Sequence, residues 1–194
     1  MKKKIILTDA DGVLLDWEYA FHVYLQQHGF NKVADGNLKY NIGKRYNIDQ
    51  DQAKKLVRIF NESAAIGFLP PLRDAMYYVK RLHEEHGYIF HCITSLSKDE
   101  NAQELRKMNL KKLFGDTAFE KFVFLDTGAD KDEALEAYRD TGYWWIEDKI
   151  VNAQVGTGLG LNSLLVEHGH NMDYNDPEIP RVKNWKEIYE RIVS

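Results

Sequence analysis

The sequence predicts an α/β fold in which helices cover a parallel sheet. Apolar, strand-like segments alternate with amphipathic, helix-like segments along most of the chain, which is typical of parallel sheets. Several strand-like segments end in acidic or hydroxyl side chains, as expected where the carboxyl ends of parallel strands form a ligand site. A chain of 194 residues, with 44% hydrophobic and 29% charged residues, can bury one core and carry a small insertion.

The apolar pattern also places the individual elements. Strands are expected at residues 4–9, 88–94, 121–126, 143–147 and 161–166. Helices are expected at residues 72–86, 99–108, 131–140, 149–156 and 185–193. The first of these helices is well marked, because apolar residues recur at helical spacing from Leu72 to Leu82, behind two prolines and before Gly87.

One stretch interrupts the alternation and predicts a helical insertion. Residues 17–69 contain no good strand pattern but two amphipathic helix patterns, at 17–28 and 49–64. We therefore expect this stretch to form a small helical cap, inserted after the first strand and folded over its end. Residues 1–16 and 70–194 are expected to form the α/β core domain.

Composition excludes several classes of function. The net charge of −4 argues against a nucleic-acid polymer or an anionic membrane as a partner. No apolar stretch reaches the roughly 18 residues that span a bilayer, and the short apolar run after the basic start is too brief for a signal peptide. Cys92 is the single cysteine and lies in an apolar strand pattern, so we expect a buried thiol and a reducing cytoplasm.

The end of the first strand carries an informative pair of acids. The apolar run from Ile5 to Leu7 leads into Asp9 and Asp11, and Gly12 then allows the backbone to turn sharply. Two carboxylates one residue apart repel each other unless a cation, a proton or strong donors compensate. A divalent metal ion facing a phosphate meets this need, and a surface Asp-Gly turn is the alternative.

Two further segments offer groups that suit a phosphate. One strand ends at Thr94 and Ser95, whose hydroxyls and nearby backbone N–H groups are able to bind phosphate oxygens. Lys131 follows the next strand and is suited to offset negative charge on a transferring phosphoryl group. Both segments stand at the carboxyl ends of predicted strands, as Asp9 and Asp11 do.

A fourth segment supplies candidate metal ligands. An apolar strand ends in Glu147 and Asp148, and Asn152 follows at the start of a helix. Asp148 offers a second carboxylate to Mg²⁺, which prefers hard oxygen ligands. Asn152 is placed to orient Asp148 or a metal-bound water, and Glu147 lies beside the ligand in the same supporting position. Capping of the following helix by Asp148 is the alternative.

In this order the four segments resemble the four motifs of the haloacid dehalogenase (HAD) superfamily, over nearly the whole chain. The pattern Asp9-Ala-Asp11-Gly after an apolar strand resembles its first motif. The resemblance implies a Rossmann-like parallel sheet with a small helical cap. By this resemblance Asp9 is the nucleophile, Asp11 the general acid and base, Thr94 or Ser95 the phosphate-binding hydroxyl, Lys131 the phosphate-binding lysine and Asp148 a metal ligand.

The resemblance also implies a reaction. Mg²⁺ held by Asp9, Asp148 and the backbone carbonyl of Asp11 would align a phosphate for in-line attack. Asp9 would form an aspartyl-phosphate, while Asp11 would protonate the leaving alcohol and then activate the hydrolytic water. Dehalogenase and phosphonatase members of the superfamily usually lack an acid at the Asp11 position, so we expect a magnesium-dependent phosphatase.

The expected substrate is a small phosphorylated metabolite recognised by the cap. The segment from Asp9 to Phe21 resembles the small-capped 5'-nucleotidases that act on deoxyribonucleotides. This resemblance makes Trp17 and Phe21 candidate substrate contacts, with an aromatic ring stacking on the base of a nucleoside monophosphate. Packing of both rings between cap and core is the alternative.

Other polar residues of the chain suggest no separate site. Lys44 and Arg45 are expected to form a solvated basic turn, with the binding of a substrate carboxylate or a second phosphate as the alternative. The seven histidines show no metal-binding spacing, and His168 and His170 are expected on a surface loop.

Three alternatives to a nucleotidase stay open on the sequence. The phosphatase could act on another small phosphorylated metabolite. A sugar phosphomutase would use the same aspartyl-phosphate but needs a cap that excludes water. A non-catalytic binding module on the same scaffold is disfavoured because Asp9, Asp11 and Asp148 are all present.

Overall fold

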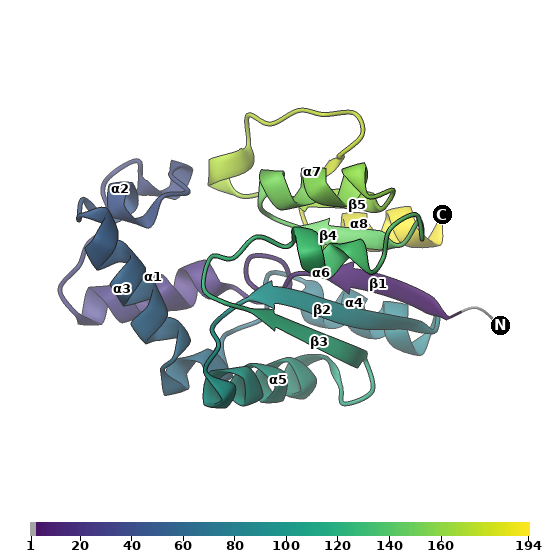
Figure 1. Cartoon of the computed structure of the whole chain (residues 1–194), viewed down its shortest axis with the longest axis horizontal. Helices are drawn as coiled ribbons and strands as arrows, with labels where there is room; N and C mark the ends of the chain where they lie inside the picture. Colours follow the sequence, from purple (N-terminus) through teal and green to yellow (C-terminus); the bar gives the residue numbers. More distant parts are fainter. Residues whose placement is uncertain (1–2) are drawn as a thin grey trace.

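The computed structural model describes residues 3–194 and has an α/β architecture (Figure 1). The strands of its sheet are β1 (Lys4–Thr8), β2 (Tyr88–Ser95), β3 (Phe119–Leu125), β4 (Trp144–Glu147), β5 (Asn162–Val166) and β6 (Arg181–Val182). Neighbouring strands are parallel, and their order is β3-β2-β1-β4-β5-β6. The predicted α/β class with a Rossmann-like parallel sheet is confirmed.

The helices connect successive strands. The α-helices are α1 (Trp17–Gln27), α2 (Ile42–Tyr46), α3 (Gln50–Asn61), α4 (Ala75–Glu84), α5 (Glu100–Phe114), α6 (Asp132–Glu136), α7 (Ile150–Gly158) and α8 (Trp185–Val193). Short 3₁₀ helices lie at η1 (Gly36–Leu38), η2 (Ala64–Phe68) and η3 (Gly169–Asn171). Several helices begin at acidic or amide side chains that accept a backbone N–H of the first turn, as Asp49 does for α3 and Asp99 for α5.

Alternating side chains of the strands face two helical layers. Ile6 of β1 and Ile146 of β4 are buried in the larger apolar cluster, together with residues of α4, α5 and α8. Their neighbours Leu7 and Trp145 belong to a second cluster with residues of α6 and α7. The sheet is therefore covered on both faces, which leaves the carboxyl ends of its strands as the place for a ligand site.

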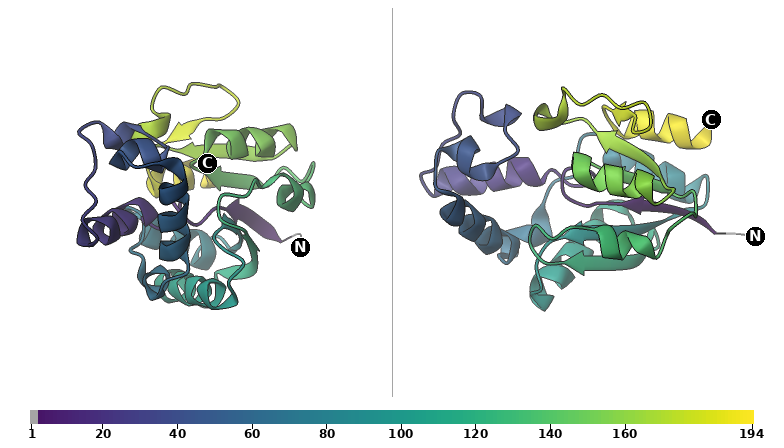
Figure 2. Two further views of the ribbon diagram at one scale, coloured as in Figure 1. Left: turned by 60° about the vertical axis from the view of Figure 1, so that its left-hand side comes forward. Right: turned by 45° about the horizontal axis from the view of Figure 1, so that its top comes forward.

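Helices α1, α2 and α3 lie beyond those carboxyl ends, at the end of the molecule opposite to both termini (Figure 1). The two views of Figure 2 keep these helices together as one group. Between β1 and β2 the described chain contains only helical elements and the isolated bridges of Leu15. The domain division into a cap of 17–69 and a core of 1–16 and 70–194 stays a prediction, and residues 1–2 lie outside the described part.

Several elements differ from the sequence-based expectation. The short strand β6 and the helix α2 were not expected, and the α2 region reads as polar and mixed in the sequence. Helix α5 continues six residues past the predicted end, because Leu110 and Phe114 prolong its buried stripe until Gly115. Helix α6 ends at Glu136, and the chain then turns through Asp140, whose φ is 57°.

Within residues 3–194, none of the helices combines the length and the apolar character needed to cross a bilayer.

Candidate active site

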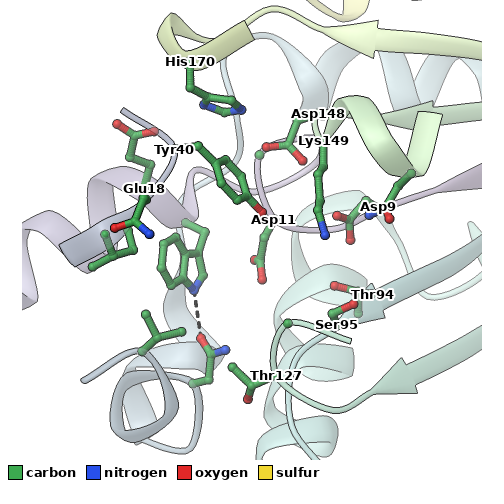
Figure 3. Close-up of a pocket in the computed structure, with 18 of the residues that line it drawn as sticks. Asp9, Asp11, Glu18, Tyr40, Thr94, Ser95, Thr127, Asp148, Lys149 and His170 are labelled. Atoms are coloured by element: carbon green, nitrogen blue, oxygen red, sulfur yellow. Dashed lines mark hydrogen bonds between the residues drawn. The ribbon is translucent and has the colours of Figure 1, made fainter. Parts of the chain in front are cut away.

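A cavity of about 510 Å³ opens between the carboxyl ends of the strands and the helices of the insertion. Its walls contain almost every site residue predicted from the sequence: Asp9, Asp11, Trp17, Thr94, Ser95, Lys131, Glu147, Asp148 and Asn152. Figure 3 shows Asp9, Asp148 and Thr94 directed into it from the strand ends and Tyr40 reaching in from the insertion. The fold thus brings together residues that are more than 130 positions apart in the sequence.

Lys131 is the centre of a buried charge cluster. Its ammonium lies 2.7 Å from Asp9 Oδ2 and 2.8 Å from Glu147 Oε2, and all three side chains are nearly excluded from solvent. Burial raises the pKa of Asp9 to about 6, because Lys131 offsets only part of the desolvation and Glu147 adds repulsion. An ammonium has three donors, so Lys131 keeps one for a ligand oxygen.

Glu147 holds the loop after β4. Its Oε1 accepts the backbone N–H groups of Asp148 and Lys149, both at 3.0 Å. Its Oε2 accepts Lys131 and, at 3.3 Å, Asn152 Nδ2. Asn152 Nδ2 is therefore bonded to Glu147 and not to Asp148, whereas the sequence predicted that Asn152 orients Asp148 or a metal-bound water. The alternative of Asp148 as a helix cap is not observed, since Lys149 occupies the N-cap of α7 without a side-chain cap bond.

Asp148 has a carboxyl group that pairs with no cation of the described chain. Oxygens of Asp9, Glu147 and Asp148 lie within 4.8 Å of one another. Lys131 pairs with Asp9 and Glu147, but no cation of residues 3–194 forms an ion pair with Asp148. Burial raises the pKa of Asp148 well above its usual range, and repulsion by Glu147 and Asp9 adds to the effect. A hard divalent cation is coordinated by carboxylate oxygens and offsets the repulsion between them. The oxygens of Asp9 and Asp148 therefore fit such an ion.

Asp11 pairs with an arginine that the sequence did not single out. Arg106 of α5 places Nη1 2.7 Å from Asp11 Oδ1 and Nη2 3.2 Å from Asp11 Oδ2. The guanidinium is fully buried, while Asp11 keeps about a fifth of its side chain exposed. The pKa of Asp11 is raised by burial, and Arg106 opposes this shift. The one signal in the sequence is a charge inside the apolar stripe of α5, between Ala102 and Leu110.

The hydroxyls of Thr94 and Ser95 differ in their partners. Thr94 is almost fully buried, and its Oγ1 makes no hydrogen bond within the described chain. Ser95 Oγ donates to the carbonyl of Ala129 at 2.8 Å. A buried hydroxyl without a partner is unfavourable by about 1–3 kcal/mol unless a ligand completes it. Thr94 is therefore the hydroxyl left available to a ligand, and Ser95 is used to hold the loop before Lys131.

The two aromatic residues predicted to contact substrate occupy different positions. Trp17 lines the cavity, and its Nε1 donates to Asn61 Oδ1 at 2.9 Å. Phe21 is buried behind it, with the two rings stacked at a centroid distance of 4.6 Å. Phe60 packs against both rings. The structure thus brings Trp17 to the cavity and places Phe21 in the core, where it supports Trp17.

The loop after β5 contributes groups that were expected on a surface loop. His168 and His170 both line the cavity and stack on each other at 5.5 Å. His168 Nε2 lies 2.7 Å from the carbonyl oxygen of Gly12, and the ring of Tyr40 packs on His170 (Figure 3). Asn171 donates to the carbonyl of Asp148 at 3.0 Å. This loop therefore forms part of the wall that joins core and insertion.

The expected basic turn is solvated only in part. Arg45 is buried, with Nη1 2.8 Å from Glu18 Oε1 and two hydrogen bonds to the carbonyl of Lys39. Lys44 is exposed. The prediction was therefore wrong for Arg45, because Glu18 and the turned backbone at Lys39 supply it with buried partners.

Comparison with known sequences places the chain near one uncharacterised protein. No protein-family model matches the chain. An uncharacterised 32.4 kDa protein from the Gp30-rIII intergenic region of Enterobacteria phage T4 is 27% identical over 143 residues, which cover 71% of this chain and 50% of that protein. The chain thus spans about half the length of this curated relative.

Comparison with solved structures identifies the fold. A haloacid dehalogenase-like hydrolase from Streptococcus pneumoniae matches with a TM-score of 0.65 at 16% identity, covering 98% of both chains. D,D-heptose 1,7-bisphosphate phosphatase from B. bronchiseptica, solved with magnesium and phosphate, matches with a TM-score of 0.59 at 11% identity, again covering 98% of both chains. This chain therefore has the haloacid dehalogenase-like fold.

Proposed function

We propose that the protein is a magnesium-dependent phosphomonoester hydrolase that acts through an aspartyl-phosphate on Asp9. The observation that carries this proposal is the position of the Asp9 carboxylate, which lies at the end of β1, in the cavity wall and 2.7 Å from Lys131. Asp148 and the unpartnered hydroxyl of Thr94 line the same cavity. A nucleophile, a cation and a hydroxyl donor at one point suit phosphoryl transfer.

The residues suited to hold Mg²⁺ are Asp9, Asp148 and the backbone carbonyl of Asp11. Support comes from the Asp148 carboxyl, which burial and repulsion by Glu147 and Asp9 keep from ionising, and from the similarly folded phosphatase that was solved with magnesium and phosphate. When bound, the ion neutralises phosphoryl oxygens and favours in-line displacement. Glu147 stays bonded to Lys131 and fixes the loop that carries Asp148.

The chain's own residues carry the reaction in two steps. In the first, a carboxylate oxygen of Asp9 bonds to phosphorus, the ester P–O bond breaks, and Asp11 gives a proton to the departing alcohol oxygen. In the second, Asp11 takes a proton from water as the water oxygen bonds to phosphorus, and the bond from phosphorus to Asp9 breaks. Lys131 and Thr94 bind the remaining phosphoryl oxygens.

The proposed substrate is a small phosphorylated metabolite, and a nucleoside monophosphate is the finer proposal. Residues 17–69 act as the cap that recognises the leaving group, since α1 and α3 line the cavity opposite the carboxylates. Phe21 covers one face of Trp17, and Trp17 itself reaches the cavity wall, where a base could stack on it. The single buried Cys92 fits action in a reducing cytoplasm.

The test is phosphate release from a panel of nucleoside monophosphates, sugar phosphates and 4-nitrophenyl phosphate, with and without Mg²⁺. Asp9→Asn should abolish release from every substrate, whereas the matched exposed variant Asp116→Asn should not change it. With 4-nitrophenyl phosphate, whose leaving group needs no proton, Asp11→Asn should accumulate a phosphorylated chain that mass spectrometry detects. No release by the wild-type protein from any substrate would contradict the proposed function.

The same panel tests the nucleotide proposal separately. Trp17→Leu should raise KM for nucleotides about tenfold, because stacking contributes roughly 1–3 kcal/mol per base. The KM for 4-nitrophenyl phosphate should change much less. Preferred turnover of sugar phosphates by the wild type would contradict the nucleotide as substrate and still support the phosphatase function.

A further inference from the structure

The buried face of α5 contains one charged side chain, Arg106. Ala102, Leu110 and Phe114 are apolar members of this face, and Arg106 lies among them with no solvent exposure. A buried guanidinium is costly unless a carboxylate and good geometry compensate it. Within residues 3–194, Asp11 is the one acid that forms an ion pair with Arg106.

The pair combines one hydrogen bond with one close ionic contact. Nη2 donates to Asp11 Oδ2 at 3.2 Å, and Nη1 lies 2.7 Å from Asp11 Oδ1 without hydrogen-bond geometry. Two contacts from one planar guanidinium restrict the rotation of the carboxylate as well as its position. The main chain of Asp11 is held separately, since Gly12 N–H donates to the carbonyl of Leu15 at 2.9 Å. Arg106 therefore determines the orientation that the backbone leaves free.

The helix that carries Arg106 is itself anchored. Asn109 Nδ2 donates to the carbonyl of Leu69 at 3.1 Å, and Leu105 and Met108 pack against Gly67 at the end of the insertion. Arg106 thus projects from a rigid element toward a carboxylate that lines the cavity. A purely stabilising role explains this poorly, because replacing a buried ion pair by apolar residues is often neutral or favourable for stability.

We propose that Arg106 is a positioning residue that holds the Asp11 carboxyl in the orientation required for proton transfer. This inference rests on the proposed phosphatase function. Arg106 contacts neither phosphate nor metal in this role. Asp11 gives its proton to the ester oxygen as the P–O bond breaks and recovers a proton from water in the second step, while the contact with Arg106 restricts the rotation of its carboxyl group.

The first experiment compares Arg106→Met with the wild type on two esters, in the presence of Mg²⁺. The alcohol of an alkyl phosphate needs a proton to leave, whereas 4-nitrophenolate leaves without one. Because general acid catalysis contributes roughly 10²–10⁴-fold, we expect alkyl phosphate turnover to fall about 10- to 100-fold. The pre-steady-state burst of 4-nitrophenolate should change less than about threefold. A merely structural role would lower both rates together, and that result overturns the proposal.

The second experiment asks whether Arg106 acts through Asp11. In an Asp11→Asn background the alkyl phosphate rate is already low, and adding Arg106→Met should change it less than about threefold, because the two residues act as a unit. If the rate losses from Asp11→Asn and Arg106→Met multiply in the double variant, the proposal is overturned. Arg106→Lys keeps the charge without the planar guanidinium and should lose an intermediate fraction of the same rate, which covers the case in which Arg106→Met does not fold. A wild type that turns over neither ester contradicts the phosphatase function itself, and the inference with it.

Discussion

At the residue scale, Gly12 is required by space as well as by conformation. Its φ of 74° lies in the region that favours glycine. The Asp148 carboxylate also approaches it so closely that a Cβ at this position would collide with Oδ2. The loops after β1 and β4 meet at this point, so the glycine lets the proposed ligands Asp9 and Asp148 come together.

Gly12→Ala should therefore impair metal binding more than folding. The new Cβ pushes the Asp148 carboxylate away, and displacement of a metal ligand or its support typically costs about 10- to 100-fold in affinity. Isothermal titration with Mg²⁺ measures this loss. Gly29→Ala is the matched control, because Gly29 has a φ of 83° but no atom within 4 Å of the added Cβ. Equal Mg²⁺ affinities of the two variants would show that the collision at Asp148 is unimportant.

The sequence predicted the polar residues at strand ends but not their supporting partners. Asp9, Thr94, Lys131 and Asp148 were placed by the rule that parallel strands end at one edge, and the structure brings them to one cavity. Their catalytic roles stay predictions. Arg106 was missed because a charged residue in a helical pattern is normally solvated, and only the tertiary contact with Asp11 shows otherwise.

At the element scale, the C-terminal end of α3 ties the insertion to the sheet. Asn61 accepts the indole N–H of Trp17 from α1 at 2.9 Å and donates to the carbonyl of Leu96, after β2, at 3.1 Å. The side chain is buried, so neither bond is exchanged for water. One amide thus fixes the position of two helices and of the aromatic ring proposed to face the leaving group.

Asn61→Leu should lower the free energy of unfolding by about 1–3 kcal/mol, because it removes the acceptor of the part-buried Trp17 N–H and the buried donor to the Leu96 carbonyl. Urea unfolding measures the loss. Asn162→Leu, which removes an exposed hydrogen bond to Gly142, is the control and should change stability much less. In a Trp17→Phe background the donor is gone, so Asn61→Leu should then cost less. If Asn61→Leu lowers stability equally in the Trp17→Phe background, Asn61 stabilises the fold through contacts other than the one to Trp17.

The elements found from the sequence are those with a long apolar pattern. Helix α4 and strand β2 are of this kind, since their buried residues recur at the spacing of a helix and in a continuous run. Helix α2 has five residues and starts at Asn41, whose side chain accepts Lys44 N–H, and β6 has two residues paired with β5. Elements this short are set by tertiary contacts, which a periodicity cannot reveal.

At the scale of the whole molecule, the strand order determines which segments meet. The sequence predicts a parallel sheet, but the order β3-β2-β1-β4-β5-β6 depends on long-range pairing that no local pattern encodes. This order puts β1 between β2 and β4, so the acids after β1 lie between the hydroxyls after β2 and the acids after β4. The resulting site contains oxygens of Asp9, Glu147 and Asp148 within 4.8 Å of one another, and among residues 3–194 the ion pairs of these acids all go to Lys131.

This excess of negative charge makes the stability of the whole chain depend on pH and on Mg²⁺. The pKa of Asp9 is about 6 in the folded protein against an ordinary 3.8, and the pKa of Asp148 is raised as well. Between pH 3.8 and about 6, Asp9 of the folded chain keeps a proton that Asp9 of the unfolded chain has released. Without metal, the contribution of Asp9 to stability is therefore lost as the pH rises through about 6, and the raised pKa of Asp148 adds a loss of the same sign.

Mg²⁺ should reverse this loss, because it binds the ionised carboxylates in the folded chain only. Near saturation we expect a rise in Tm of about 5 °C or more at about pH 7.5. At about pH 5 protons compete for the same oxygens, so the rise should be less than about half as large. Differential scanning calorimetry at the two pH values, with and without Mg²⁺, measures both shifts. Asp148→Asn should remove most of the Mg²⁺ effect and Asp116→Asn should keep it. A shift of equal size at both pH values would place the ion away from these carboxylates.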